Sequence, residues 1–136
     1  MTEGWRQLVL SLAALWNLIG GIGALVDPKA HFAQLYTAQL SLDDPLQAFF
    51  YQATWINVIA WAVGYLLVAR DPAGRTPVLF AGGAGKIAYF GVTLILFQSG
   101  VGTPMLLVAG LVDLVFAGLF MYIVWLGTLT RGATAA

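Results

Sequence analysis

The chain has 136 residues, of which 60% are hydrophobic and only 9% are charged, and its mean hydropathy is +0.86. Soluble domains carry about 25% charged residues, so this chain lacks the polar surface that water on every side would require, and lipid is its expected solvent. Its zero net charge and lack of a basic tract argue against a nucleic-acid partner, and its lack of cysteine excludes disulfides, thiolate metal sites and cysteine nucleophiles.

Four apolar stretches are each long enough to cross a hydrocarbon core of about 30 Å. They cover residues 7–26, 46–69, 78–98 and 104–127. The first follows an early arginine, as in a signal peptide, but it has the length of a spanning helix and ends at Asp27-Pro28 without a small-residue cleavage site. We therefore expect residues 1–136 to form a single all-α domain, an integral membrane antiparallel four-helix bundle that runs up-down-up-down.

Prolines mark the breaks between the spans, and each of the five follows an Asp or a Thr. An Asp or Thr N-cap with Pro at the first helical position is a helix-start signal, because the N–H that Pro lacks would be unpaired there. The predicted starts of the second, third and fourth spans are Asp44-Pro45, Thr76-Pro77 and Thr103-Pro104. Asp27-Pro28 is predicted to start a short helix in the first loop.

The first loop is the only long one, and its short helix is expected to be amphipathic. Phe32, Leu35 and Tyr36 share one face of it. Such a helix either lies in the outer membrane interface or caps the outer mouth of the bundle, with the interface favoured. His31, the only histidine, is expected to be a solvated loop residue, and its being alone excludes a bis-His haem within one chain.

Basic residues predict the orientation of the bundle. Four arginines lie at the N-terminus, in the second loop and at the C-terminus, namely Arg6, Arg70, Arg75 and Arg131. Only Lys29 lies on the opposite side. Because positive charge collects on the cytoplasmic side, both termini are expected in the cytoplasm.

Two charged residues fall inside the spans, one of each sign and on consecutive helices: Lys86 and Asp113. An ionisable side chain at mid-bilayer costs about 2.5–3.5 kcal/mol on insertion scales and normally faces the bundle interior, where it pairs. A short loop joins these helices, so they should be antiparallel neighbours. Counted from their own ends, both residues reach mid-membrane, which predicts a buried Lys86–Asp113 ion pair.

The first two spans each add one strongly polar residue at similar depth, Asn17 and Asn57. In all four helices the residue four positions earlier is small, which is typical of a packed helix face. The sequence therefore predicts a central cluster of Asn17, Asn57, Lys86 and Asp113. The neighbours expected to line or extend this cluster are Trp16, Trp55, Trp61, Gln52 and Tyr89.

The cluster has two interpretations. A buried polar network can fix the register of helices without further activity, and for either asparagine alone this is favoured. Intramembrane ionisable residues also mark ligand sites, proton relays and ion paths, and for Lys86–Asp113 this is favoured, since uncharged polar pairs would fix the register at a lower cost. No catalytic motif or metal-ligand set is present, and no cofactor or metal is expected.

The four spans, the glycine-rich first helix ending in an acidic-Pro step ("LIGGIGALVDPKAHF") and the small-residue-rich third helix resemble the DoxX-like small bacterial membrane proteins. The resemblance implies a bacterial inner-membrane setting. Members of that group are described as oxidoreductase subunits or as partner-assisting membrane proteins. It carries no residue assignments.

Three functions remain in competition. The first is a ligand-binding or accessory module of a larger membrane system. The second is a proton-coupled small-solute transporter or channel protomer that acts as a homo-oligomer. The third is an intramembrane enzyme with Lys86 as base or Schiff-base nucleophile, which the carboxylate of Asp113 opposes by favouring the ammonium. The expected partners are the lipid bilayer, a small lipophilic or polar ligand, and a second copy or a larger complex.

Overall fold

The computed structural model describes residues 2–133, with side chains described as far as Gly127. Within that part of the chain the secondary structure is helical, apart from one isolated bridge between Tyr36 and Gly102. The helices are α1 (Glu3–Val26), α2 (Pro28–Leu35), α3 (Pro45–Arg70), α4 (Arg75–Gln98) and α5 (Pro104–Ala133). The predicted all-helical fold with a short helix in the first loop is confirmed.

Four of the helices are long and apolar enough to cross a membrane: α1, α3, α4 and the Pro104–Gly127 part of α5, each with 24 to 26 residues. At 1.5 Å per residue such a helix is about 36 Å long, slightly more than the hydrocarbon core. Large apolar side chains such as Ile22, Phe80 and Val115 lie exposed on the outside of the bundle, as lipid-facing residues do. The chain is a small multi-pass membrane protein.

Side-chain caps start the helices largely as predicted. The carboxylate of Asp27 accepts a hydrogen bond from the backbone N–H of Ala30 (3.1 Å), and that of Asp44 accepts one from Leu46 (2.9 Å). The prediction that Thr76-Pro77 starts the third span is wrong, because α4 begins at Arg75. A proline is tolerated throughout the first turn of a helix, where no backbone N–H has an intrahelical partner.

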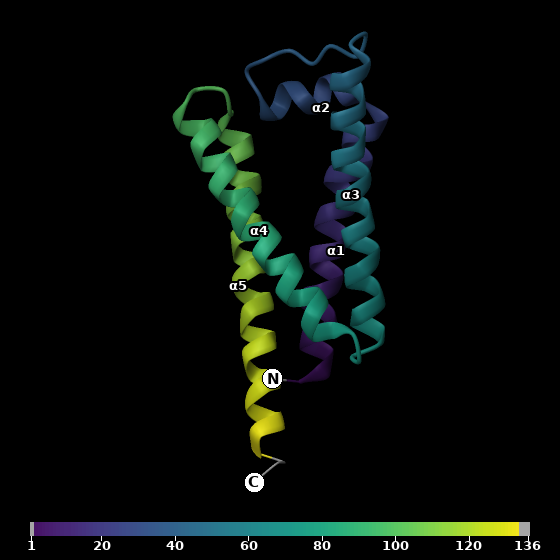
Figure 1. The fold of residues 1–136 in the computed structure, drawn as a ribbon, viewed down its shortest axis with the longest axis vertical. Helices are drawn as coiled ribbons and strands as arrows, with labels where there is room; N and C mark the ends of the chain where they lie inside the picture. The colour runs from purple at the N-terminus through teal and green to yellow at the C-terminus, as the bar shows by residue number, and fades with distance from the viewer. Residues whose placement is uncertain (1, 134–136) are drawn as a thin grey trace.

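The helices form two antiparallel hairpins (Figure 1). α1 packs along α3, and α4 packs along α5, whereas contacts between the hairpins are fewer. The chain runs up through α1, down through α3, up through α4 and down through α5, and both described ends of the chain lie at the same end of the bundle. At the other end α2 lies across the space between the hairpins.

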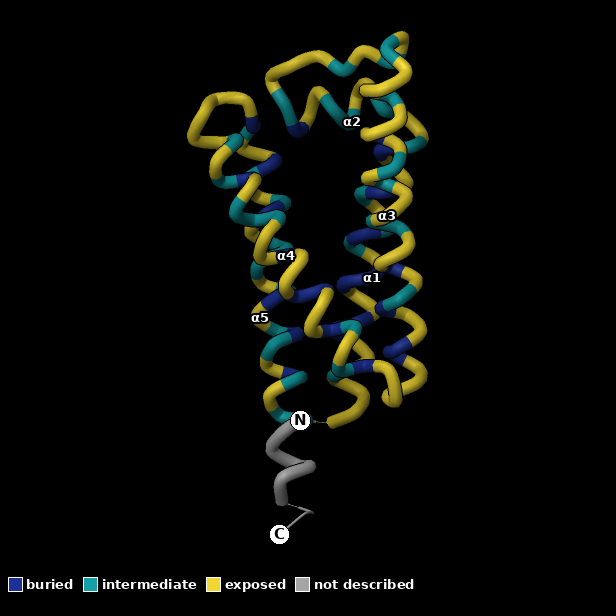
Figure 2. Tube along the Cα trace, viewed as in Figure 1, coloured by how far each residue is buried: buried dark blue, intermediate teal, exposed yellow. Residues whose placement is uncertain are grey.

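The two hairpins pack tightly only toward the end that holds the N-terminus, where buried residues gather (Figure 2). The rings of Tyr65 on α3 and Phe120 on α5 lie 5.0 Å apart. Gly82 on α4 permits this approach, since a Cβ at that position would lie 2.6 Å from the Tyr65 hydroxyl. Leu10 and Leu79 complete this core and are fully buried. This core closes the bundle at the end where the chain begins.

An arginine fork joins the hairpins beyond that core. Buried Arg75 donates two hydrogen bonds to the carboxylate of Glu3, at 3.0 and 2.6 Å. It also donates to the backbone carbonyls of Val68 (2.9 Å) and Ala69 (3.3 Å) near the end of α3. The planar guanidinium reaches all of these acceptors at once, which a lysine ammonium could not do.

Backbone hydrogen bonds close the opposite end. Thr37 donates to the carbonyl of Val101 (2.9 Å), and Thr103 donates to the carbonyl of Leu35 (2.9 Å). These bonds attach the end of α2 to the turn between α4 and α5. The hairpins are thus joined at both ends, and α2 forms a roof over the space between them. These contacts agree with the predicted cap over the bundle, while the predicted place in the membrane interface stays a prediction.

Candidate functional site

A buried ion pair lies near the middle of the second hairpin. Lys86 Nζ on α4 is 2.5 Å from Asp113 Oδ1 on α5, and the two side chains are only 7% and 14% exposed. The antiparallel packing of the two helices brings the residues to the same depth. An isolated charge would be costly there, so each group compensates the other.

Asn17 connects this pair to the first hairpin. Its side-chain oxygen accepts a hydrogen bond from Lys86 Nζ (3.1 Å), while its amide nitrogen donates to the backbone carbonyl of Val58 (3.2 Å). The orientation of the amide follows from these partners, because the ammonium can only donate and the carbonyl can only accept. Lys86, Asp113 and Asn17 therefore form one polar centre that contacts both hairpins.

Asn57 and Gln52 lie outside the polar centre, and the prediction of a four-residue cluster is corrected in this respect. Both are exposed on α3, and the amide of Asn57 donates to the carbonyl of Ala53 in its own helix (3.0 Å). Because each residue turns a helix by about 100°, the face of α3 that carries Trp55 and Ala62 inward leaves Asn57 outside. Small residues occur on both faces of α3, with Ala60 exposed and Ala62 and Ala69 buried, so a small residue four positions before Asn57 did not identify the inner face.

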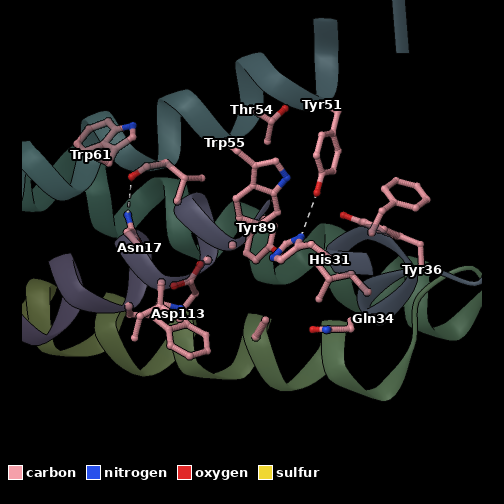
Figure 3. Close-up of a pocket in the computed structure, with 18 of the residues that line it drawn as sticks. Asn17, His31, Gln34, Tyr36, Tyr51, Thr54, Trp55, Trp61, Tyr89 and Asp113 are labelled. Carbon is pink, nitrogen blue, oxygen red and sulfur yellow. Dashed lines mark hydrogen bonds between the residues drawn. The ribbon is translucent and has the colours of Figure 1, made fainter. Parts of the chain in front are cut away.

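A cavity of about 1070 Å³ extends from the polar centre to the roof, between the two hairpins. Its lining is mostly aromatic and aliphatic. Figure 3 shows Asn17 and Asp113 toward one end, Tyr36 and Gln34 toward the other, and His31, Trp55 and Tyr89 between them. The predicted neighbours Trp16, Trp55, Trp61 and Tyr89 all line this cavity. Pockets that hold small ligands have similar volumes, about 300–1,000 Å³.

The cavity is open at its sides. Ile19 on α1 and Phe50 on α3 both line it, yet they are 61% and 60% exposed. The hairpins make few contacts between α1 and α5 or between α3 and α4, which leaves room for openings on both sides. In a membrane these openings face the acyl chains, so a lipophilic molecule could enter without passing through water.

Several polar atoms at the cavity can form further hydrogen bonds. Lys86 has three N–H donors and gives two of them to Asp113 and Asn17. Within the part of the chain that the structure describes, neither Asp113 Oδ2 nor the Tyr89 hydroxyl has a hydrogen-bond partner. Polar groups left unpaired in an apolar setting are costly, and a ligand that bonded to them would recover that cost.

His31 was expected to be solvated, but its ring forms part of the cavity wall below the roof. Its Nδ1 lies 3.1 Å from the hydroxyl of Tyr51, and its ring meets Trp55 edge to face with centroids 4.5 Å apart. Burial lowers the pKa of His31 from its usual 6.5, so the ring is neutral near pH 7. The signal in the sequence was the spacing: His31 lies on the helical face next to Phe32 and Leu35, which the roof turns inward.

The described side chains include no group of three or more His, Asp or Glu residues that could share a metal ion. The arrangement can instead hold an uncharged molecule by hydrogen bonds at its polar end and by aromatic contacts along its body. No family model, no curated protein and no solved structure matches the chain. The site therefore has to be interpreted from its own chemistry.

Proposed function

We propose that the protein is a membrane-embedded binding module for an uncharged lipophilic molecule. The observation that carries this proposal is the cavity between the hairpins, which ends on the polar centre of Lys86, Asp113 and Asn17. Lys86 has a third N–H beyond the two that it gives to Asp113 and Asn17, and Asp113 has a second oxygen. Together they suit a group that both accepts and donates a hydrogen bond, such as an amide or a hydroxyl.

The charges of the site favour an uncharged ligand. The ammonium of Lys86 and the carboxylate of Asp113 sum to zero. An ionised ligand would add a net charge to a region of low dielectric constant, where a charge without a partner is strongly disfavoured. A neutral head group needs only hydrogen bonds.

Transport is less well supported than binding. Below the polar centre the bundle is filled by Leu10, Tyr65, Leu79 and Phe120, all of which are buried. A solute would have to displace this core to cross the membrane, whereas binding requires no such opening. Flux into proteoliposomes that disappears in Lys86→Met would reverse this preference, and borohydride trapping of an aldehyde on Lys86 would favour an enzyme.

The proposed setting is a bacterial inner membrane with both termini in the cytoplasm, which agrees with the likeness to DoxX-like proteins. Arg6, Arg70 and Arg75 lie toward the end of the bundle that holds the N-terminus, and Lys29 lies at the roof.

Because the chain has no cysteine, Ser41→Cys gives a single thiol near the roof. A membrane-impermeant maleimide should label it from the periplasmic side of intact spheroplasts. The bound molecule would then be presented to a larger membrane complex or to a second copy.

Native mass spectrometry of the protein released from its membrane tests the binding proposal. Gly85 lines the cavity, and a Cβ there would meet nothing within 4 Å, so Gly85→Phe should place a bulky ring in the cavity next to Lys86 without disturbing the bundle. Gly64 has the same free space but lies outside the lining, so Gly64→Phe is the matched control. We expect a co-purifying neutral molecule on the wild type and on Gly64→Phe, but not on Gly85→Phe. Equal occupancy of all three proteins, or none on the wild type, would refute the proposal.

A further inference from the structure

His31 occupies a second polar position along the cavity. Its Nδ1 contacts the Tyr51 hydroxyl at 3.1 Å, and Trp55 packs against its ring. The opposite edge of the ring faces α1, where a Cβ on Gly23 would lie 3.7 Å from His31 Cδ2. The ring is therefore held from two sides, and its Nε2 belongs to the edge that is not occupied by Tyr51.

The hydrogen bonds of the Tyr51 hydroxyl indicate the tautomer of the His31 ring. The Tyr51 hydroxyl donates its only proton to the backbone carbonyl of Pro28, at 3.3 Å. The hydroxyl oxygen can then only accept from His31 Nδ1, so Nδ1 carries the proton. Nε2 is left as a bare acceptor, and no other residue that the structure describes donates to it.

We infer that His31 Nε2 accepts a hydrogen bond from the bound molecule, so that the cavity selects a ligand with a hydroxyl donor at this end. This inference rests on the proposed binding function and adds a second recognition point to it. Asn17 marks the polar centre and Gly23 marks the level of His31 on the same helix. Six residues at 1.5 Å each separate the two points by about 9 Å along α1.

The ligand class follows from these two points. It is a neutral, lipophilic molecule with an amide-like or hydroxyl group at the Lys86–Asp113 end and a hydroxyl about 9 Å away. An aromatic or otherwise rigid body between the two groups suits the rings of Trp55 and Tyr89, which line this stretch. A phenol carries its donor on such a body.

Two probes separate this hydroxyl from the remainder of the ligand. N-octyl 4-hydroxycinnamamide has an uncharged amide at one end of a rigid ring system and a phenol at the other, and N-octyl 4-methoxycinnamamide lacks only the donor. Both absorb tryptophan emission, so quenching of the tryptophans in detergent-solubilised protein measures binding. His31 is the only histidine, so ¹⁵N-histidine labelling gives one pair of ring-nitrogen resonances that reports the tautomer directly.

In the free protein we expect a protonated Nδ1 and an unprotonated Nε2. The phenol should bind about fivefold more tightly than the methyl ether, as one hydrogen bond requires, and should alone shift the Nε2 resonance. Tyr51→Phe should free the ring to take either tautomer and reduce the preference for the phenol. Tyr122→Phe removes an exposed hydroxyl on α5 outside the cavity lining and should change neither.

The possible results separate the role of His31 from the proposed binding function. Equal binding of both probes with an unmoved Nε2 would overturn the inference and leave the binding function intact. A protonated Nε2 in the free protein would overturn the inference by itself. Binding of neither probe, together with an empty cavity in native mass spectrometry, would overturn both.

Discussion

Replacing Lys86 by Met removes the ammonium and keeps a side chain of similar length. Asp113 then remains 14% exposed without its partner. Removing one member of a buried ion pair typically destabilises a protein by about 3–5 kcal/mol, because the remaining charge is left uncompensated. We expect Lys86→Met to lower the free energy of unfolding by this amount. Asp113→Leu should do the same, because it leaves the ammonium of Lys86 without a counter-charge.

The double variant Lys86→Met/Asp113→Leu removes both charges and retains apolar volume. It leaves one defect, the side-chain oxygen of Asn17, which loses its donor. A lost hydrogen bond of this kind costs about 1–2 kcal/mol. The double variant should therefore be more stable than either single variant. The sum of the two single losses minus the loss in the double variant gives a coupling energy of about 4–9 kcal/mol.

Reversible unfolding in mixed micelles of dodecyl maltoside and SDS, followed by tryptophan fluorescence, measures these differences. Asn57→Leu is the control, since Asn57 is exposed and bonds only within its own helix. This variant should be neutral within about 0.5 kcal/mol. Strictly additive losses for Lys86 and Asp113 would show that the charges are not coupled and would refute the polar centre. A large loss in Asn57→Leu would show that α3 turns its other face inward.

Three further outcomes are expected. Gly21→Ala should destabilise the bundle by about 1–3 kcal/mol in the same unfolding assay, because the new Cβ would lie 2.5 Å from a branched side chain of α3. In the control Gly64→Ala, the new Cβ meets nothing within 4 Å, so this variant should be neutral or stabilising. Arg75→Lys should lower the free energy of unfolding by about 1–3 kcal/mol, because an ammonium cannot form all the hydrogen bonds that the guanidinium donates to Glu3 and to the α3 carbonyls. An unchanged stability would contradict this role of Arg75. The pKa of His31 is lowered in the folded state, so the unfolded chain binds the proton first as the pH falls. Thermal stability should therefore fall as the pH drops below 6.5 and level off below the folded pKa. His31→Gln should lose this part of the pH dependence, and an unchanged profile would contradict the prediction.

The amino-acid sequence by itself determined the solvent and the elements. Low charge and four long apolar runs require lipid, and the Asp-Pro and Thr-Pro steps placed most helix starts within a few residues. The depth of Lys86 and Asp113 also followed from the sequence, because two charges of opposite sign in consecutive antiparallel spans have few ways to avoid lipid except by pairing.

Only the tertiary structure decided which faces of the helices meet. In lipid, a helix such as α3 carries apolar residues on every face, so periodicity shows which residues share a face without showing which face is inside. The aromatic face of α3 lines the cavity and leaves Asn57 outside, although its spacing matched that of Asn17. The roof and the role of His31 depend on backbone bonds between Leu35, Thr37 and the distant α4–α5 turn. Such contacts between segments more than sixty residues apart leave no local pattern, so they could be found only from the folded chain.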